Sequence, residues 1–118
     1  PTTVVYIRPQ RYTKEFVDKS DYYTLSFLPD GHREALSYLG SHSGRDEDKL
    51  AKTDLTGTAT DDYAYIEQAK LVLVCKKLYR QPMTPDSFID KSIIEKCYAA
   101  GDFHEMYVGE IVKVLVSE

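Results

Sequence analysis

Hydrophobic and polar positions alternate with a period of two along much of the chain, which is typical of β-strands with one buried face. Strands are predicted over Thr2–Arg8, Tyr22–Leu28, Tyr63–Ile66, Ala69–Arg80 and Phe103–Val116. In Ala69–Arg80 apolar residues occupy both faces, which indicates a central strand that is covered on each side.

The last predicted strand carries a glycine within an otherwise apolar pattern. Gly109 is expected to mark a β-bulge or the close approach of another backbone or ligand. The alternation places a row of apolar side chains on the face opposite Gly109. These residues are Met106, Val108, Val112, Val114 and Val116.

Short helices are predicted between the strands. Pro9 ends the first strand, and Thr13 is expected to cap a helix that runs to about Lys19. Asp30 is expected to cap a second helix, and Gly40 to end it after Leu39 in the left-handed conformation. The polar stretch 53–62 is predicted to be a loop, and segments 86–89 and 91–98 are each predicted to hold a short helix.

The stretch Leu39–Leu50 has the pattern of a helix start that could bind an anion. Ser43 stands three residues before Asp46, which is the spacing of a capping box, so a further helix is expected to run to about Lys52. A helix start offers unpaired N–H groups and a positive dipole end, which favour a phosphate. The alternative is a tight helix–helix connection with solvated charges. The candidate residues are Ser43, Gly44, Arg45, Asp46 and Lys49.

A second candidate lies where the first strand turns into the first helix. Arg8 and Arg11 supply two guanidinium groups, which recognise phosphate bidentately, and Thr13 supplies a hydroxyl. A capped surface turn is the alternative interpretation. The two motifs together give two helix starts that favour an anion in one small domain.

Composition narrows the classes of protein. The chain has 118 residues, enough for one domain over 1–118, and its net charge of −4 gives no electrostatic footprint for nucleic acid. No apolar run reaches membrane-spanning length. Cys75 and Cys97 are interpreted as reduced thiols of a cytoplasmic protein.

Candidate catalytic and metal-binding patterns are few. His32, His42 and His104 do not fall at metal-ligand spacings, so no zinc site is predicted. There is no nucleophile elbow, no dinucleotide-binding glycine motif and no P-loop. We therefore predict no catalytic side chain and no metal site.

The predicted fold is mainly β with inserted helices, a mostly antiparallel barrel. Four or five strands would leave open sheet edges, to be covered by more chain or by a partner subunit. The first strand begins at Thr2 without a preceding turn, which suggests that sequence is missing upstream. The alternative is a chain that starts there after removal of an initiator Met.

Several motifs in chain order resemble the flavin reductase-like, FMN-binding proteins, especially the flavoredoxin branch. The resemblance covers nearly all of the chain, and the family's N-terminal segment, with barrel strands and a flavin-binding loop, has no counterpart here. The motifs are Arg8-Pro-x-Arg-Tyr-Thr13, Tyr23-Thr-Leu-Ser-Phe27, Leu39-Gly-x-x-Ser-Gly-Arg-Asp-x-Asp-Lys49, Ala69-x-Leu-Val-Leu-x-Cys-x-Lys-Leu-Tyr79 and His104-x-Met-Tyr-x-Gly-Glu-Ile111.

The resemblance implies an FMN-binding split β-barrel, incomplete at its N-terminus, and a homodimer with FMN near the subunit interface. It implies hydride transfer from NAD(P)H to flavin and onward transfer to a small-molecule or protein acceptor. The alternatives are a non-enzymatic FMN-binding electron carrier and a truncated fragment that binds no cofactor. The positions to which the resemblance gives a ligand role are Arg8, Arg11, Tyr12, Thr13, Ser43, Gly44, Arg45, Asp46 and Lys49.

Overall fold

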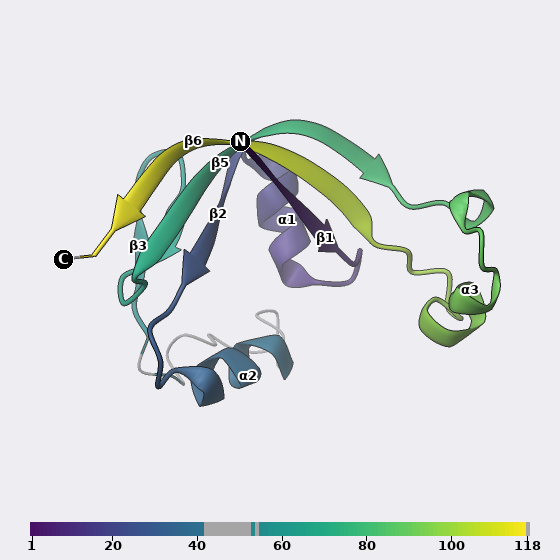
Figure 1. The fold of residues 1–118 in the computed structure, drawn as a ribbon, viewed down its shortest axis with the longest axis horizontal. Coiled ribbons are helices and arrows are strands. Elements are labelled where there is room, and N and C mark those ends of the chain that lie inside the picture. Colours follow the sequence, from purple (N-terminus) through teal and green to yellow (C-terminus); the bar gives the residue numbers. More distant parts are fainter. Residues whose placement is uncertain (42–52, 54, 118) are drawn as a thin grey trace.

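The computed structural model describes residues 1–41, 53 and 55–117, and in this part the chain is mainly β with a few short helices (Figure 1). The strands are β1 (Thr2–Ile7), β2 (Tyr22–Phe27), β3 (Gly57–Ala59), β4 (Ala64–Ile66), β5 (Leu71–Pro82) and β6 (Glu105–Val116). The helices are α1 (Tyr12–Lys19), α2 (Arg33–Ser41), α3 (Ser92–Cys97) and the 3₁₀ turn η2 (Pro85–Ser87).

Four antiparallel strands form one curled sheet in the order β1-β6-β5-β2, and β3 and β4 form a separate hairpin. The antiparallel arrangement and the central place of β5 are as predicted. The curl makes a half-barrel whose two edges, β1 and β2, approach each other. Tyr23 of β2 reaches across the inside, and its hydroxyl lies 2.7 Å from the Thr3 Oγ1 of β1.

The core lies inside the curl. Val17 of α1 packs there against Tyr23, Cys75 and Tyr107, and both Cys75 and Tyr107 are completely buried. A second cluster on the outer side of the sheet contains Ala69, Val72 and Val74, which the β3–β4 hairpin helps to cover with Tyr63 and Tyr65.

The structure confirms the prediction that another part of the protein approaches Gly109 closely. The approaching group is the side chain of Tyr23, a core residue. A Cβ atom at this position would lie 2.6 Å from the Tyr23 hydroxyl oxygen and 2.9 Å from the Cys75 Cβ. The register between β5 and β6 also shifts beside it, between Lys77 and Tyr79.

The predicted face of the last strand is correct for Met106 and Val108 but wrong from Val112 onward, because a bulge at Val112 changes the alternation. Cys75 pairs with Ile111 while Val74 pairs with Lys113, so Val112 is an extra residue on β6. Directly paired residues share a face. Beyond the bulge, Val114 and Val116 pair with Leu73 and Leu71 and therefore lie on the inner face, the face of Gly109.

Two predicted helix caps are wrong. Helix α1 begins at Tyr12, two residues earlier than a cap at Thr13 would give. Its N-cap is Arg11, which makes no side-chain cap, and the Arg11 N–H closes a turn onto the Arg8 carbonyl. Helix α2 begins only at Arg33, because the preceding turn uses Gly31 at a φ of 101° and carries the chain past Asp30.

Other boundaries also differ from the predictions. Gly40 does not end α2, which continues to Ser41, since a helix interior tolerates a single glycine at modest cost. The predicted loop 53–62 contains β3, which pairs with β4. Segment 86–89 is a 3₁₀ turn at Pro85–Ser87, and α3 lies within the predicted segment 91–98. The helix predicted to start after Ser43 lies outside the described residues.

Candidate functional site

The turn from β1 into α1 opens onto a cavity of about 400 Å³ that is lined by three of the predicted ligand residues. Because Thr13 is not used as a helix cap, its side chain is available to the cavity. Tyr12, also predicted, does not line this cavity and packs edge-on against Phe16 with 4.9 Å between ring centroids. The lining residues are Tyr6, Ile7, Arg8, Arg11, Thr13 and His104.

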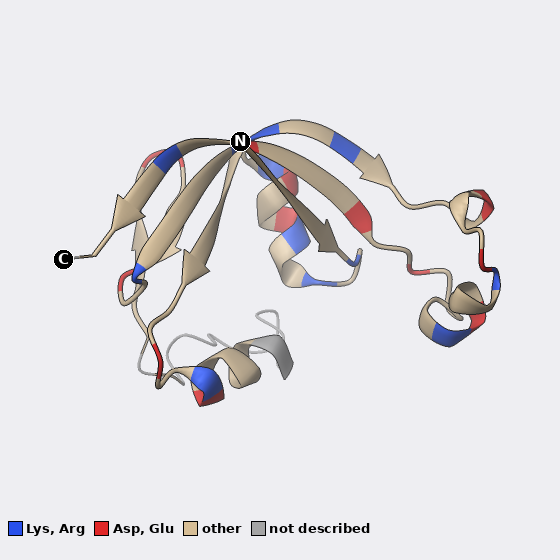
Figure 2. Ribbon diagram, viewed as in Figure 1, with Lys and Arg blue, Asp and Glu red and all other residues tan. Residues whose placement is uncertain are grey.

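Helix α1 is held against the sheet by a network of charges, and this fixes the position of Arg11 and Thr13 at its start. The Tyr107 hydroxyl donates to Asp18 Oδ1 at 2.5 Å, and Lys14 Nζ lies 2.7 Å from Asp18 Oδ2. Arg80 Nε lies 3.1 Å from Glu105 Oε1. Figure 2 shows positive and negative segments interleaved along α1.

The network perturbs the titration of two of its members. Burial raises the pKa of Asp18, but hydrogen bonds from Lys14 and Tyr107 and the charges of Lys14 and Arg80 outweigh it, so the pKa lies below its usual value. Burial and the adjacent Asp18 carboxylate raise the pKa of Tyr107 far above its usual value. Tyr107 therefore remains a neutral hydrogen-bond donor to a charged carboxylate.

Arg8 points its guanidinium at protein groups that come from the other end of the chain. Its Nη1 lies 2.7 Å from Asp102 Oδ2, and its Nη2 donates to the Cys97 carbonyl at 2.9 Å. Its Cζ lies 4.8 Å from the centroid of the Tyr98 ring, a cation–π geometry. Gln10 adds a hydrogen bond to the same Asp102 oxygen at 2.7 Å.

His104, like Tyr6 and Ile7, lies in the cavity wall although the sequence interpretation gave it no ligand role. Its Nδ1 lies 2.5 Å from the Tyr98 hydroxyl. Burial lowers the pKa of His104, the charge of Arg8 lowers it further, and Asp102 opposes them in part. The ring is therefore neutral at pH 7, and it adds one donor or acceptor to a cavity that also holds Arg11 and Thr13.

The pairing of β1 with β6 is what brings His104 to this place. Ile7 pairs with Glu105, so the residues that follow β1 and those that precede β6 meet at one end of the sheet. The sequence alone does not place Arg8 next to Asp102. Their proximity could be predicted only if the antiparallel pairing of β1 with β6 were already known.

A wider apolar groove of about 690 Å³ lies between the two edge strands and the β3–β4 hairpin. Its surface is formed mainly by apolar side chains, and Val4, Leu25 and Phe27 contribute from the sheet. The hairpin is tied to β2 by the Thr24 hydroxyl, which donates to the Ala64 carbonyl at 2.6 Å. The groove has the chemistry to accept an extended apolar segment or a flat apolar ring.

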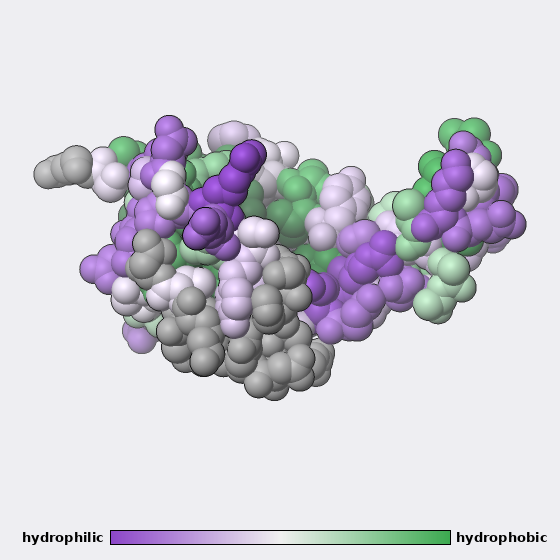
Figure 3. All heavy atoms as spheres, turned by 90° about the horizontal axis from the view of Figure 1, so that it is seen from below, coloured by the Kyte–Doolittle hydropathy of each residue, from purple (hydrophilic) through white to green (hydrophobic). Residues whose placement is uncertain are grey.

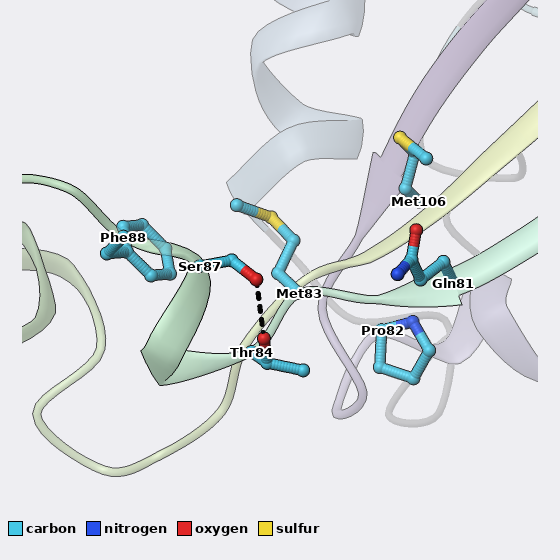
Figure 4. Close-up of a pocket in the computed structure, with 7 residues that line it drawn as sticks. All are labelled: Gln81, Pro82, Met83, Thr84, Ser87, Phe88 and Met106. Atoms are coloured by element: carbon cyan, nitrogen blue, oxygen red, sulfur yellow. Dashed lines mark hydrogen bonds between the residues drawn. The ribbon is translucent and has the colours of Figure 1, made fainter.

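A third pocket of about 170 Å³ lies where the segment between β5 and β6 leaves the sheet (Figure 4). Met83, Phe88 and Met106 give it an apolar wall. The hydroxyls of Thr84 and Ser87 lie 2.7 Å apart, so one of them donates a hydrogen bond to the other. The accepting hydroxyl keeps its own O–H as a donor at the rim of this mainly apolar pocket.

The predicted residues of the second motif, Ser43, Gly44, Arg45, Asp46 and Lys49, lie outside the described residues. Of the first motif, the structure brings Arg8, Arg11 and Thr13 to one cavity. None of the described helices combines the length and the hydrophobicity that a transmembrane helix requires.

The fold and the cavity define a half-barrel protein with a cationic, hydroxyl-bearing site at one end of its sheet. The family model of the flavin reductase-like domain matches residues 1–118, and the chain belongs to this family. None of the curated proteins matches the chain.

Solved structures have the same fold. An FMN-binding protein from Thermus thermophilus, with bound p-hydroxybenzaldehyde, is 28% identical with a TM-score of 0.72, and the match covers 100% of this chain and 56% of that one. Flavoredoxin of Desulfovibrio vulgaris is 22% identical with a TM-score of 0.74 and coverages of 100% and 54%. A protein with a split barrel domain from Shewanella frigidimarina is 22% identical with a TM-score of 0.73 and coverages of 100% and 52%. The chain spans about half the length of these structures.

Proposed function

We propose that the chain is part of an FMN-binding flavoprotein that transfers electrons from NAD(P)H through flavin to an acceptor. The observation that carries this proposal is the cavity at the start of α1, where Arg11 and Thr13 meet in a chain of the flavin reductase-like family. An arginine and a threonine hydroxyl suit a phosphate and a polyol chain.

The residues present fit FMN in their chemistry. Arg11 and Thr13 would hold the phosphate or the ribityl chain, with Lys49 and the backbone near Ser43 as further candidates from the second motif. Apolar side chains such as Leu25 and Phe27 in the groove suit a flat ring. Bound flavin would supply the two-electron chemistry, so no side chain of the protein needs to act as an acid or base.

The test is a pair of measurements on the purified full-length gene product. FMN binding is followed by quenching of flavin fluorescence, and reduction by NADH or NADPH by the loss of absorbance. Binding with reduction supports a flavin reductase. Binding without reduction by either nucleotide supports the electron carrier that exchanges electrons only with protein partners. The absence of binding contradicts both.

We expect Arg11→Ala and Lys49→Ala to weaken binding of FMN more than binding of riboflavin, which lacks the phosphate. A charge-assisted contact contributes on the order of 1.5–3 kcal/mol, or roughly one to two decades of affinity. Lys113→Ala, which removes one positive charge from an exposed position on β6, is the matched control. Equal losses for the two flavins would mean that neither residue contacts the phosphate.

We also propose a homodimer that acts in the cytoplasm. Among the described strands, none pairs with the outer edge of β1 or β2, and the side chains of Val4, Tyr6 and Tyr79 are 47%, 55% and 52% exposed. An exposed apolar surface of this kind favours association. Both described cysteines are free thiols, as a reducing compartment requires. Light scattering is expected to give the mass of a dimer, and a stable monomer at micromolar concentration would count decisively against it.

A further inference from the structure

The segment from Met83 to His104, here called the arm, leaves the sheet after β5 and returns to it at β6. It stands apart from the body of the protein (Figures 1 and 3). Its interior is a small aromatic cluster, in which Tyr98 stacks on Phe103 at 4.8 Å and Phe88 lies 5.7 Å from Tyr98. A cluster of this size does not by itself fix how the arm lies relative to the sheet.

Arg8 connects the arm to the body. The described contacts of its guanidinium are with the arm: the Asp102 carboxylate and carbonyl, the Cys97 carbonyl and the face of the Tyr98 ring. The guanidinium thus engages a charge, a backbone acceptor and an aromatic face at once, which a planar, multiply donating group can do and a lysine cannot. The Met83 N–H, which donates to the His104 carbonyl at 3.0 Å, joins the two ends of the arm.

Tyr98 transmits this anchoring to the cavity. Tyr98 is only 7% exposed and its ring packs against both Arg8 and Phe103, so the position of its hydroxyl oxygen is restrained. That hydroxyl lies 2.5 Å from His104 Nδ1, and the two rings meet edge to face. When a neutral imidazole accepts a hydrogen bond at Nδ1, its proton is on Nε2.

We propose that Arg8 is a positioning residue: it docks the arm on the sheet and, through Tyr98, presents His104 as an Nε2–H hydrogen-bond donor in the wall of the cavity that holds Arg11 and Thr13. Arg8 and Arg11 then have different tasks although they are three residues apart. Arg11 belongs to ligand binding, and Arg8 to the geometry of the wall. The inference about affinity rests on the proposed flavin function, and the inference about His104 does not.

The first experiment measures the tautomer of His104 by ¹⁵N NMR at pH 7, without any ligand. We expect an unprotonated Nδ1 and a protonated Nε2 in the wild type. Tyr98→Phe and Arg8→Gln are both expected to give a mixture of tautomers, and Arg11→Gln, the matched control, is expected to leave the tautomer unchanged. An Nδ1–H tautomer in the wild type, with Tyr98 as acceptor, would overturn the proposal.

The second experiment compares flavin binding by the same variants of the full-length gene product. Arg8→Gln is expected to weaken FMN and riboflavin by the same factor, about tenfold, similar to the loss of a residue that orients a metal ligand. Arg11→Gln is expected to weaken FMN preferentially. A preferential loss of FMN in Arg8→Gln would make Arg8 a phosphate ligand and overturn the assignment.

Asp102→Asn leaves Arg8 in place and removes the negative charge of the arm with which Arg8 pairs. It is expected to reproduce the tautomer change and the equal loss of both flavins, and wild-type behaviour of this variant would contradict the proposal. Circular dichroism verifies that each variant is folded, and Arg8→Lys, which keeps the charge but not the planar fork, replaces Arg8→Gln if that variant unfolds. If the wild type binds neither flavin, the proposed function fails while the tautomer results still decide the role of Arg8.

Discussion

Replacement of Gly109 by alanine is expected to lower the free energy of unfolding by about 3 kcal/mol, the upper end of the usual cost of overpacking a core. The new Cβ would lie 2.6 Å from the Tyr23 hydroxyl oxygen, 2.8 Å from its Cζ and 2.9 Å from the Cys75 Cβ. Neither neighbour can easily move away. Cys75 is completely buried, and the Tyr23 hydroxyl is hydrogen-bonded to Thr3. Urea unfolding followed by far-UV circular dichroism measures the loss.

Two further variants separate the steric effect from a general effect of replacing glycine. Gly101 has a φ of 73°, and a Cβ added to it would have no neighbouring atom within 4 Å, so Gly101→Ala should cost only the backbone strain, about 1–2 kcal/mol. In a Tyr23→Leu background, which removes the ring atoms, the cost of Gly109→Ala should fall by at least half. An unchanged cost in that background would show that Tyr23 is not the obstacle.

The same substitution has a consequence for the groove. The Tyr23–Thr3 hydrogen bond is the described side-chain link between the edge strands β2 and β1 across the inside of the half-barrel. A Cβ at Gly109 would press directly on the tyrosine that makes this link. Loss of the link would let the edges separate and would widen the groove that the edge strands line.

The long strands could be predicted from the sequence because their alternation is a direct result of burial. Leu71, Leu73 and Cys75 alternate with Val72 and Val74, and a strand that is apolar on both faces must be central. The hairpin strand β3 could not be predicted, since three residues of Gly-Thr-Ala carry too little pattern and their pairing depends on β4.

The bulge at Val112 shows a second reason why the sequence of one strand does not suffice to predict which face its residues occupy. The sequence Ile-Val-Lys-Val-Leu-Val has apolar residues at both parities after position 111, so it accepts either register. Which one forms is decided by packing across the sheet, where Ile111 faces Cys75 and Val114 faces Leu73. That information is held in β5 and not in the strand that contains the bulge.

The candidate site likewise contains residues whose location could be predicted from the sequence and residues whose location could not. Arg8, Arg11 and Thr13 are neighbours in the sequence, so their shared location could be predicted from a single turn. Asp102, which pairs with Arg8, and His104, which lines the cavity with Arg8 and Thr13, lie about ninety residues further along the chain. The protein partners of Arg8 also could not be predicted, because a guanidinium next to a helix start has the same local sequence whether it binds a phosphate or another part of the chain.

We expect residues 1–118 alone to bind FMN weakly, with a dissociation constant above roughly 100 µM, and a longer chain that completes the barrel to bind it in the sub-micromolar range. The reason lies in the two open edges. Strands β1 and β2 border an apolar groove, and no described strand of the chain pairs with the outer edge of either one. A ligand that binds there must order the edges as well as itself, and this cost is subtracted from its affinity.

Titration of FMN into both chains, followed by fluorescence quenching, measures the difference. The longer chain is the full-length gene product, and riboflavin serves as the control without phosphate. A site formed from two segments should lose affinity for both flavins when one segment is absent, because the apolar groove contacts the ring that they share. Sub-micromolar FMN binding by the 118 residues, a free energy of roughly −8 kcal/mol or better, would show that the half-barrel is already a complete flavin site.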